Sequence, residues 1–386
     1  MSKLDPILPG ATLGMLGGGQ LGRMFTLAAR QMGYRVSVLT PEGDSPTGQI
    51  AHQEHCAPYD DVDAVSRFAE EVAVVTFEFE NVPAETVAAA EKHAPVRPGG
   101  ELLHTTQNRL REKRALAAAG VPTVRFAAIE SKDDLAAAVD DIGTPSILKT
   151  AAWGYDGKGQ ARIEQPEDAE RAWSDIGRST AVLEAVAPFE REISVVGARG
   201  LDGSIALYQP FDNDHHRHIL DVTLSPADIP ERTAVQAHDF TRTLLEAWDV
   251  VGVLCVEMFL LPNGELLVNE IAPRPHNSGH VTIDSHVCSQ FEQQVRAVCG
   301  LPLGSPKQHT PAAMVNLLGD LWQDGEPDWA SVCATEAVAL HLYGKAEARP
   351  GRKMGHLTAV GPTLAEARDR ALAARSALTA RSSTVS

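Results

Sequence analysis

The sequence predicts a mixed α/β and α+β protein with three domains, at residues 1–110, 111–305 and 306–386. The chain has 386 residues, which is long for one hydrophobic core. Its first third alternates short apolar runs with helical patterns, as in a doubly wound parallel sheet. Its middle third contains Asn263-Gly264 between two apolar runs, which indicates an antiparallel hairpin. A small β-rich C-terminal domain completes the prediction.

The N-terminal domain is predicted from alternating strands and helices. Strands are expected at 11–16, 34–39 and 72–76, and helices at 23–32 and 62–70. A helix over 108–119 ends at Gly120, with Pro122 just beyond it. Glycine commonly ends a helix and proline cannot continue one, so we expect a domain boundary here.

The later elements follow in order. Strands are expected at 145–149, 181–184, 192–198, 204–210, 253–261, 265–272, 312–318 and 337–342, and helices at 234–248 and 364–379. The polar tail at 382–386 is expected to be disordered.

Composition excludes several classes of protein. The net charge of −17 disfavours non-specific binding to nucleic acid or to an anionic membrane. No run of about 18 apolar residues could span a membrane, and the N-terminus lacks a signal-peptide core. Five scattered cysteines without a C-x-x-C pair indicate reduced thiols, a cytoplasmic protein and no zinc site. Cys255 and Cys288 are expected in the core.

Residues Gly17–Gly22 match G-x-G-x-x-G between a strand and a helix, the fingerprint of dinucleotide binding. The acidic residue expected at the end of the second strand is missing, because that strand runs into Thr40-Pro41. This argues against an NAD-binding or sensor protein. A turn that packs the helix on the sheet and holds another small ligand remains open.

A second glycine-rich segment, Gly154–Gln160, follows a strand that ends in Lys149. Glycines let backbone N–H groups approach phosphate oxygens closely. The segment is not a Walker A loop, so it indicates a flexible phosphate flap outside the P-loop class. A tight surface hairpin is the alternative.

The hairpin predicts a metal site. A two-residue turn would pair Pro262 with Glu265 and place Glu257 opposite Glu270. Cys255, Phe259, Val268 and Ala272 would share that face. Facing carboxylates repel each other, and Mg²⁺ held by one or two carboxylates plus substrate phosphates would remove the conflict. A bulge that shifts the register, or an exposed face with solvated acids, remains open.

Together these segments resemble the ATP-grasp superfamily and, within it, are similar to the 5-(carboxyamino)imidazole ribonucleotide synthetases. The resemblance covers nearly the whole chain. Its segments are GGGQLGRM (17–24), TFEFENV (76–82), QNRLREK (107–113), GYDGKGQ (154–160), EISVVGARG (192–200), NEIAPRPHNSGH (269–280) and HLYGKAEARPGRKMGH (341–356). It implies an ATP-grasp fold and an ADP-forming carboxylase of purine biosynthesis that uses ATP, Mg²⁺, bicarbonate and aminoimidazole ribonucleotide, without biotin. It also implies a homodimer.

The resemblance assigns residues to roles. The implied ATP contacts are Arg109, Lys149, Gly154, Tyr155, Asp156, Gly157, Lys158, Gly159, Gln160, Glu184, Ala185, Val186, Ala187, Glu192, His215, Asn269 and Glu270. The implied contacts to the ribonucleotide are Gln20, Leu21, Glu78, Glu80, Arg274, His276, Asn277, Lys345 and Arg352. Tyr155, Asp156, Lys149 and Arg274 would be catalytic, and Glu257 and Glu270 would bind Mg²⁺. His215 in a solvated loop, and Lys345 and Arg352 as plain surface cations, remain alternatives.

The rival enzyme is a formate-dependent glycinamide ribonucleotide transformylase, which shares the ATP-grasp frame. The segments 17–24 and 269–280 favour the carboxylase. A purely structural protein has little support, because many charged groups fall at strand ends and turns.

Overall fold

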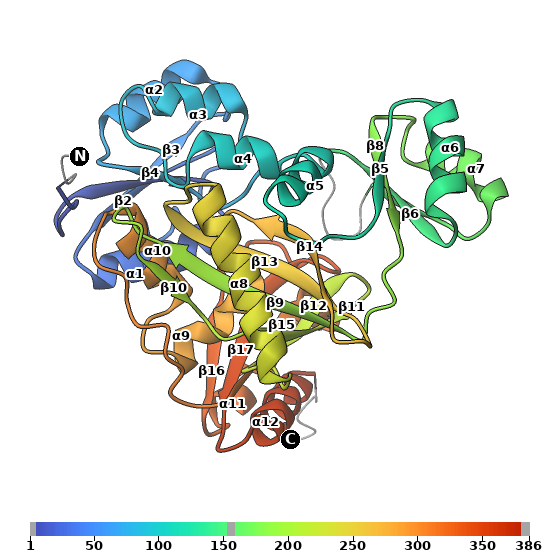
Figure 1. The fold of residues 1–386 in the computed structure, drawn as a ribbon. Coiled ribbons are helices and arrows are strands. Elements are labelled where there is room, and N and C mark those ends of the chain that lie inside the picture. Colours follow the sequence, from blue (N-terminus) through green and yellow to red (C-terminus); the bar gives the residue numbers. More distant parts are fainter. Residues whose placement is uncertain (1–4, 153–158, 380–386) are drawn as a thin grey trace.

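The computed structural model describes residues 5–152 and 159–379 (Figure 1). Within these ranges the strands form one parallel and two antiparallel sheets. The predicted fold class is thereby confirmed. The parallel sheet has the order β3-β2-β1-β4. Its strands are β1 (Thr12–Leu16), β2 (Arg35–Thr40), β3 (Gln53–Cys56) and β4 (Val75–Phe77), and the helices of this region are α1 (Gln20–Gln31), α2 (Val62–Glu70), α3 (Ala84–Ala90) and α4 (Gly100–Thr106).

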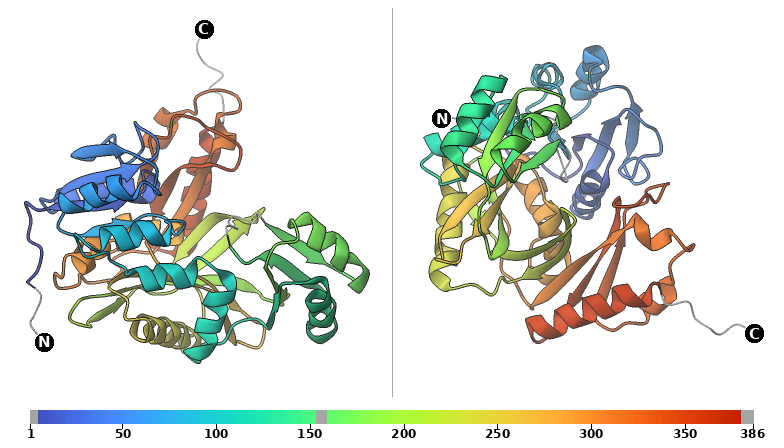
Figure 2. Two further views of the ribbon diagram at one scale, coloured as in Figure 1. Left: turned by 90° about the horizontal axis from the view of Figure 1, so that it is seen from above. Right: turned by 90° about the vertical axis from the view of Figure 1, so that its right-hand side faces the viewer.

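A small sheet with the order β5-β8-β6-β7 projects from the rest of the molecule (Figures 1 and 2). It follows helix α5 (Arg109–Ala118), and helices α6 and α7 pack against it. Its elements are β5 (Phe126–Ile129), α6 (Lys132–Ile142), β6 (Ser146–Thr150), β7 (Gln160–Ile163), η1 (Pro166–Asp168), α7 (Ala169–Asp175) and β8 (Ala181–Ala185).

The central sheet is antiparallel and has the order β14-β13-β9-β11-β12-β15-β17-β16, with β10 paired to β9. Its first strands are β9 (Arg191–Arg199), β10 (Ile205–Leu207), β11 (Phe211–His216), β12 (Ile219–Ser225), β13 (Gly252–Leu260) and β14 (Leu266–Ala272). The C-terminal strands β15 (Ala312–Leu318), β16 (Val338–Leu342) and β17 (Lys353–Val360) continue it. Its helices are α8 (Glu231–Ala247), η2 (Asn277–Val281), α9 (Thr282–Ser285), α10 (Gln290–Val298), η3 (Gly319–Trp322), α11 (Trp329–Cys333) and α12 (Leu364–Ala377).

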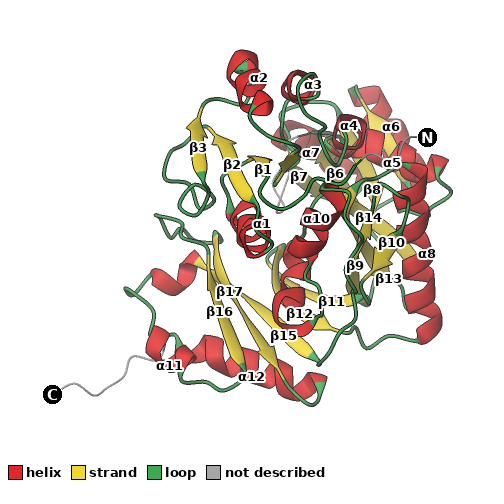
Figure 3. Cartoon of the chain, turned by 90° about the vertical axis from the view of Figure 1, so that its left-hand side faces the viewer, coloured by secondary structure: helices red, strands yellow, loops and turns green. Residues whose placement is uncertain are grey.

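The N-terminal sheet shares a core with the central part of the chain. Helix α10 lies between α1 and the strands β9 and β13 (Figure 3). Phe291 and Val295 of α10 are buried in one apolar cluster with Met24 and Phe25 of α1. Burying this apolar surface holds the parallel sheet against the central sheet, so loops from both can line one site.

The hairpin around Gly264 differs from the prediction. Leu261 N–H donates to Glu265 O at 2.9 Å, so the turn contains one more residue than predicted. A register shift next to Glu257 then absorbs the extra residue. Glu257 and Glu270 are therefore still paired, as predicted. Val268 was wrongly placed on their face: it pairs with Met258 and lies in the opposite core.

Other predictions need correction. The strand expected over 204–210 is only the short β10. Strands β3, β5, β7, β11, β12 and β17 were not predicted. Cys255 and Cys288 are buried, as expected. In the described ranges no helix is long and apolar enough to cross a membrane. Residues 154–158 of the glycine-rich segment and the tail at 382–386 lie outside the described residues.

Candidate active site

The acidic centre of the site lies on the central sheet. Glu257 on β13 faces Glu270 on β14, and Glu192 on β9 pairs with Phe259, two residues along β13. Residues two apart on a strand point to one face, so Glu192 and Glu257 share a face. Burial and the charges of Glu257 and Glu270 raise the pKa of Glu192 to about 7. Burial and the charge of Glu257 raise the pKa of Glu270. Three acids thus lie on neighbouring strands, and their charges act on one another.

A histidine neutralises one of these acids. The His276 Nε2 atom lies 2.8 Å from Glu257 Oε1. Burial alone would raise the pKa of Glu257, but the adjacent imidazole holds this pKa at about 2. Burial disfavours the imidazolium, yet Cys255 and Glu257 raise the pKa of His276 to about 10. The site therefore presents an ionised Glu257 and a cationic His276 side by side.

Basic groups face the acids from the small sheet and from α5. Lys149 at the end of β6 and Lys113 on α5 share the Glu184 carboxylate, with Nζ–O distances of 2.7 Å and 3.1 Å. The Arg109 guanidinium donates to Thr150 O at 3.0 Å. The charges of Arg109 and Lys149 lower the pKa of Glu270 against the effect of burial. The two predicted phosphate ligands therefore lie near the acidic centre.

Glu184 holds two lysines, a structural role that the sequence did not indicate. Its side chain is only 5% exposed and is held by two lysines. Burial opposes its ionisation, but Lys149 and then Lys113 keep its pKa below the ordinary value. Ala185, Val186 and Ala187 lie just beyond, at the end of β8 and in the link to β9. Glu184 thus joins α5, β6 and β8 beside the predicted adenine edge.

Glu112 and Lys113 are site residues that sequence reasoning missed. Glu112 Oε2 accepts from Ile271 N–H at 3.3 Å. Burial, followed by the charge of Glu270, raises the pKa of Glu112 to about 8. Glu112 and Lys113 lie three and four residues after Arg109 on one helix, so all three share a face. That spacing was a signal that could have identified them.

The glycine turn holds a carboxylate of the protein itself. Glu78 Oε2 accepts from Gly22 N–H at 3.0 Å, and Oε1 accepts from Gly19 N–H. The N-terminus of a helix favours an anion, and here Glu78 occupies it. This explains why the fingerprint needs no dinucleotide. Gln20 is half-buried, while the Leu21 side chain packs in the core, which leaves only its backbone to meet a ligand.

The loop after β14 is tied to the N-terminal sheet. Arg274 forms a two-pronged ion pair with Glu80, with Nη2–Oε1 at 2.8 Å. Asn277 is buried, and neither polar atom of its side chain has a hydrogen-bond partner among the described residues. Buried polar groups are rarely left unpaired, so Asn277 is placed to meet a ligand. His215, on β11, lies 3.1 Å from Glu192.

The C-terminal cations reach toward this region. Lys345 Nζ donates to Lys353 O at 2.6 Å and lies 5.6 Å from the centre of the Tyr343 ring. The charge of Lys345 acts on half-buried Glu78. Arg352 donates to Glu347 O at 2.8 Å.

For some predicted site residues, the structure gives the position of the backbone in the fold. Gly159 O accepts from Thr150 N–H at 2.8 Å, and Gln160 begins β7. Asn269 lies beside the register shift, just before Glu270. Gly154, Tyr155, Asp156, Gly157 and Lys158 lie outside the described residues.

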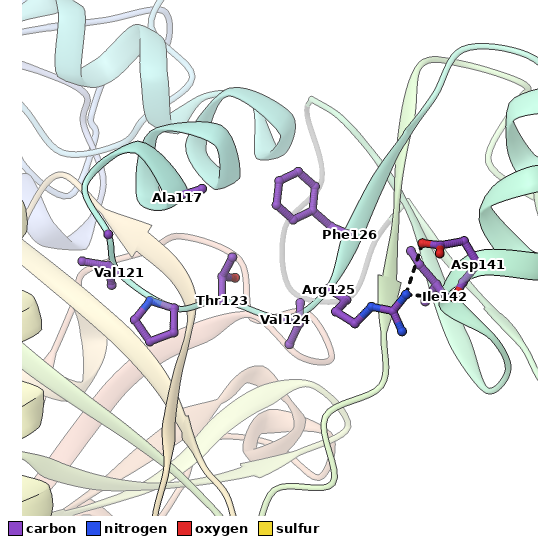
Figure 4. A pocket seen from close by; sticks show the side chains of 10 residues that line it. Ala117, Val121, Thr123, Val124, Arg125, Phe126, Asp141 and Ile142 are labelled. Atoms are coloured by element: carbon purple, nitrogen blue, oxygen red, sulfur yellow. Dashed lines mark hydrogen bonds and ion pairs between the residues drawn. The ribbon is translucent and has the colours of Figure 1, made fainter.

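A separate pocket of about 470 Å³ lies where the chain passes from α5 to β5 (Figure 4). Phe126 and the exposed ion pair between Arg125 and Asp141, at 3.1 Å, line it. None of the acids of the central sheet contributes to this pocket, so it is distinct from the site described above.

Comparison with known proteins agrees with this fold and site. Residues 114–291 match the family model of the ATP-grasp domain, and residues 10–107 match the ribonucleotide synthetase preATP-grasp domain. Residues 312–370 match the phosphoribosylaminoimidazole carboxylase C-terminal domain. The protein is therefore an ATP-grasp enzyme.

Relatives that match nearly the whole chain show which ATP-grasp family it belongs to. The chain is 44% identical to the N5-carboxyaminoimidazole ribonucleotide synthase of Bacillus subtilis strain 168, over 93% of each chain. A crystal structure of such a synthetase with ADP is 40% identical, with a TM-score of 0.91 over 97% of this chain and 98% of that one. The Aspergillus clavatus enzyme, solved with ADP and 5-aminoimidazole ribonucleotide, is 27% identical, with a TM-score of 0.87 over 95% and 98%. The chain belongs to the N5-carboxyaminoimidazole ribonucleotide synthase family.

Proposed function

We propose that this chain uses ATP and bicarbonate to carboxylate 5-aminoimidazole ribonucleotide, forming N5-carboxyaminoimidazole ribonucleotide in purine biosynthesis. The observation that carries the proposal is the pairing of Glu257 with Glu270 beside Arg109 and Lys149. Phosphate-binding cations and a pair of metal-binding acids are the parts that phosphoryl transfer requires. Membership in the synthase family supplies the substrate.

The two glutamates fit a magnesium ion. Carboxylate oxygens are the protein ligands that Mg²⁺ prefers, and the charge of Glu257 raises the pKa of Glu270, a conflict that a divalent cation would remove. When bound, Mg²⁺ would neutralise charge on the ATP phosphates.

The protein side chains orient the first chemical step. Arg109 and Lys149 would hold the phosphates of ATP. A bicarbonate oxygen then attacks the γ-phosphorus, ADP leaves, and carboxyphosphate forms. The positive charges of Arg274 and His276 would hold bicarbonate in line, because both groups are cationic at neutral pH. Holding two reactants in line removes much of the entropic barrier.

The second step transfers the carboxyl group. The amine of the ribonucleotide bonds to the carboxyl carbon of carboxyphosphate, or of the CO₂ released from it. Phosphate departs and the amine loses one proton. The unpaired Asn277 amide and the cation of Lys345 would bind the ribonucleotide, and Arg352 would add a second cation for its 5′-phosphate. The site must exclude water during this step, because water hydrolyses carboxyphosphate.

Phosphate release tests the proposal. Purified protein is incubated with Mg·ATP, and the ribonucleotide and bicarbonate are each added or omitted. Release that needs both, with a carboxylated product, supports the proposal. Parallel mixtures contain formate with glycinamide ribonucleotide. Release only in those mixtures would assign the chain to the transformylases instead.

A further inference from the structure

A continuous chain of hydrogen bonds ends on the imidazole of His276. Thr223 Oγ1 donates to Asn213 Oδ1 at 3.0 Å, and Asn213 Nδ2 donates to Ser194 Oγ at 2.8 Å. Ser194 Oγ lies 2.8 Å from Ser278 Oγ. Ser278 Oγ lies 2.9 Å from His276 Nδ1. The far nitrogen of His276 meets Glu257 at 2.8 Å.

The residues of this chain of hydrogen bonds are shielded from water. Thr223, Ser194 and Ser278 are 0% exposed, and Asn213 is 7% exposed. A buried polar group that loses its partner cannot replace it with water, so each link is costly to break. The first three links come from the neighbouring strands β12, β11 and β9. The chain of hydrogen bonds therefore begins in the central sheet rather than in a loop.

Ser278 is the link that touches the histidine. A hydroxyl both donates and accepts hydrogen bonds, so Ser278 can hold Nδ1 of the ring whether or not that nitrogen carries a proton. Glu257 holds the ring from the other nitrogen. Attachment at both nitrogens fixes the plane of the imidazole. Ser194 in turn fixes the hydroxyl of Ser278.

We propose that Ser278, supported by Ser194, is a positioning residue that sets the orientation of His276 and, through it, of the Glu257 carboxylate. The proposal rests on the proposed function for its effect on rate. Neighbours that orient a ligand-holding histidine or carboxylate typically contribute 10- to 100-fold to activity or metal affinity. Neither serine needs to touch substrate.

Alanine variants test this role against a matched control. Ser278→Ala and Ser194→Ala each remove one hydroxyl group of this chain of hydrogen bonds. Ser285→Ala removes a hydroxyl that is equally buried but outside the chain, since Ser285 Oγ donates to Val281 O at 2.7 Å. We expect kcat for phosphate release to fall about 10- to 100-fold in the first two variants, with KM for ATP unchanged. Ser285→Ala should keep the kcat of the wild type.

A spectroscopic measurement separates positioning from the reaction itself. The ¹⁵N resonances of His276, assigned by their loss in His276→Gln, should move in Ser278→Ala and Ser194→Ala but not in Ser285→Ala. Unmoved resonances, or equal losses of kcat in all three variants, would overturn the proposal. If wild-type protein shows no ribonucleotide-dependent phosphate release, the proposed function fails, while the resonances still decide whether Ser278 positions His276.

Discussion

Glu257 and Glu270 face each other across β13 and β14, and the charges of Arg109 and Lys149 act on Glu270. Opposed like charges weaken a sheet by up to about 1 kcal/mol. The pair is therefore kept at a cost to stability, which a bound cation would offset.

Neutralising Glu270 should separate stability from activity. In Glu270→Gln without Mg²⁺, we expect the free energy of unfolding to rise by up to about 1 kcal/mol. With Mg·ATP, kcat should fall at least about a hundredfold, because one of the two carboxylates that would hold the charge-neutralising Mg²⁺ is lost. Urea denaturation and phosphate release measure the two effects. Glu265→Gln, at the exposed turn of the same hairpin, is the control. An unchanged kcat in Glu270→Gln would contradict the assignment.

Glu184 should be a major contributor to stability. In Glu184→Gln, Lys113 would remain almost fully buried without a compensating charge. Breaking a buried ion pair costs about 3–5 kcal/mol. The exposed pair of Glu164 with Arg162 is a suitable control, because surface pairs contribute about 0–1 kcal/mol. Urea denaturation of Glu184→Gln and Glu164→Gln compares the two sites. Equal, small losses would show that Glu184 acts only at the nucleotide.

The contribution of Glu112 to the stability of the ligand-free protein should fall as pH rises. The pKa of Glu112 is about 8 in the fold and about 4.3 in an unfolded chain. Between these values the folded state binds more protons, so the free energy of unfolding decreases with pH. The slope from this one group is up to about 1.4 kcal/mol per pH unit. In denaturation curves from pH 5 to about 8, the wild type should lose stability relative to Glu112→Gln as pH rises. Identical slopes for both proteins would rule out this contribution.

Gly19 should not tolerate a side chain. A Cβ atom at Gly19 would displace the carboxylate at the end of the Glu78 side chain, whereas one at Gly99 would meet nothing within 4 Å. Both glycines precede a helix with extended backbone, so Gly99→Ala is a matched control. We expect Gly19→Ala to lose about 1–3 kcal/mol more than Gly99→Ala, the range for an overpacked site. Thermal unfolding of both variants measures this difference. Equal midpoints would show that Glu78 can move aside freely.

The pairing of Glu257 with Glu270 could be predicted from the sequence, although the turn could not. The turn contains one residue more than the sequence indicated, and the register shift beside Glu257 removes one. The longer turn and the register shift therefore leave Glu257 paired with Glu270, as predicted. Val268 lies between the turn and the shift, so its predicted partner was wrong. A bulge depends on the neighbouring strands, so the hairpin sequence alone could not reveal it.

Other features depended on tertiary contacts. Strand β11 reads Phe-Asp-Asn-Asp-His-His, a polar run without strand alternation. It forms a strand because β9 and β12 flank it. The spacing from Arg109 places Lys113 on the same face of α5, but only the packing of α5 against β8 and β14 buries it. Local pattern carries no information about such burial.

The most direct test of the account follows the oxygen atoms of bicarbonate. Protein, Mg·ATP and 5-aminoimidazole ribonucleotide are incubated with ¹⁸O-labelled bicarbonate, and the released phosphate is analysed by mass spectrometry. Phosphorylation of bicarbonate predicts one ¹⁸O atom in each phosphate, with two in the carboxyl group of the product. Phosphate without label, released while the ribonucleotide is carboxylated, would contradict a carboxyphosphate intermediate.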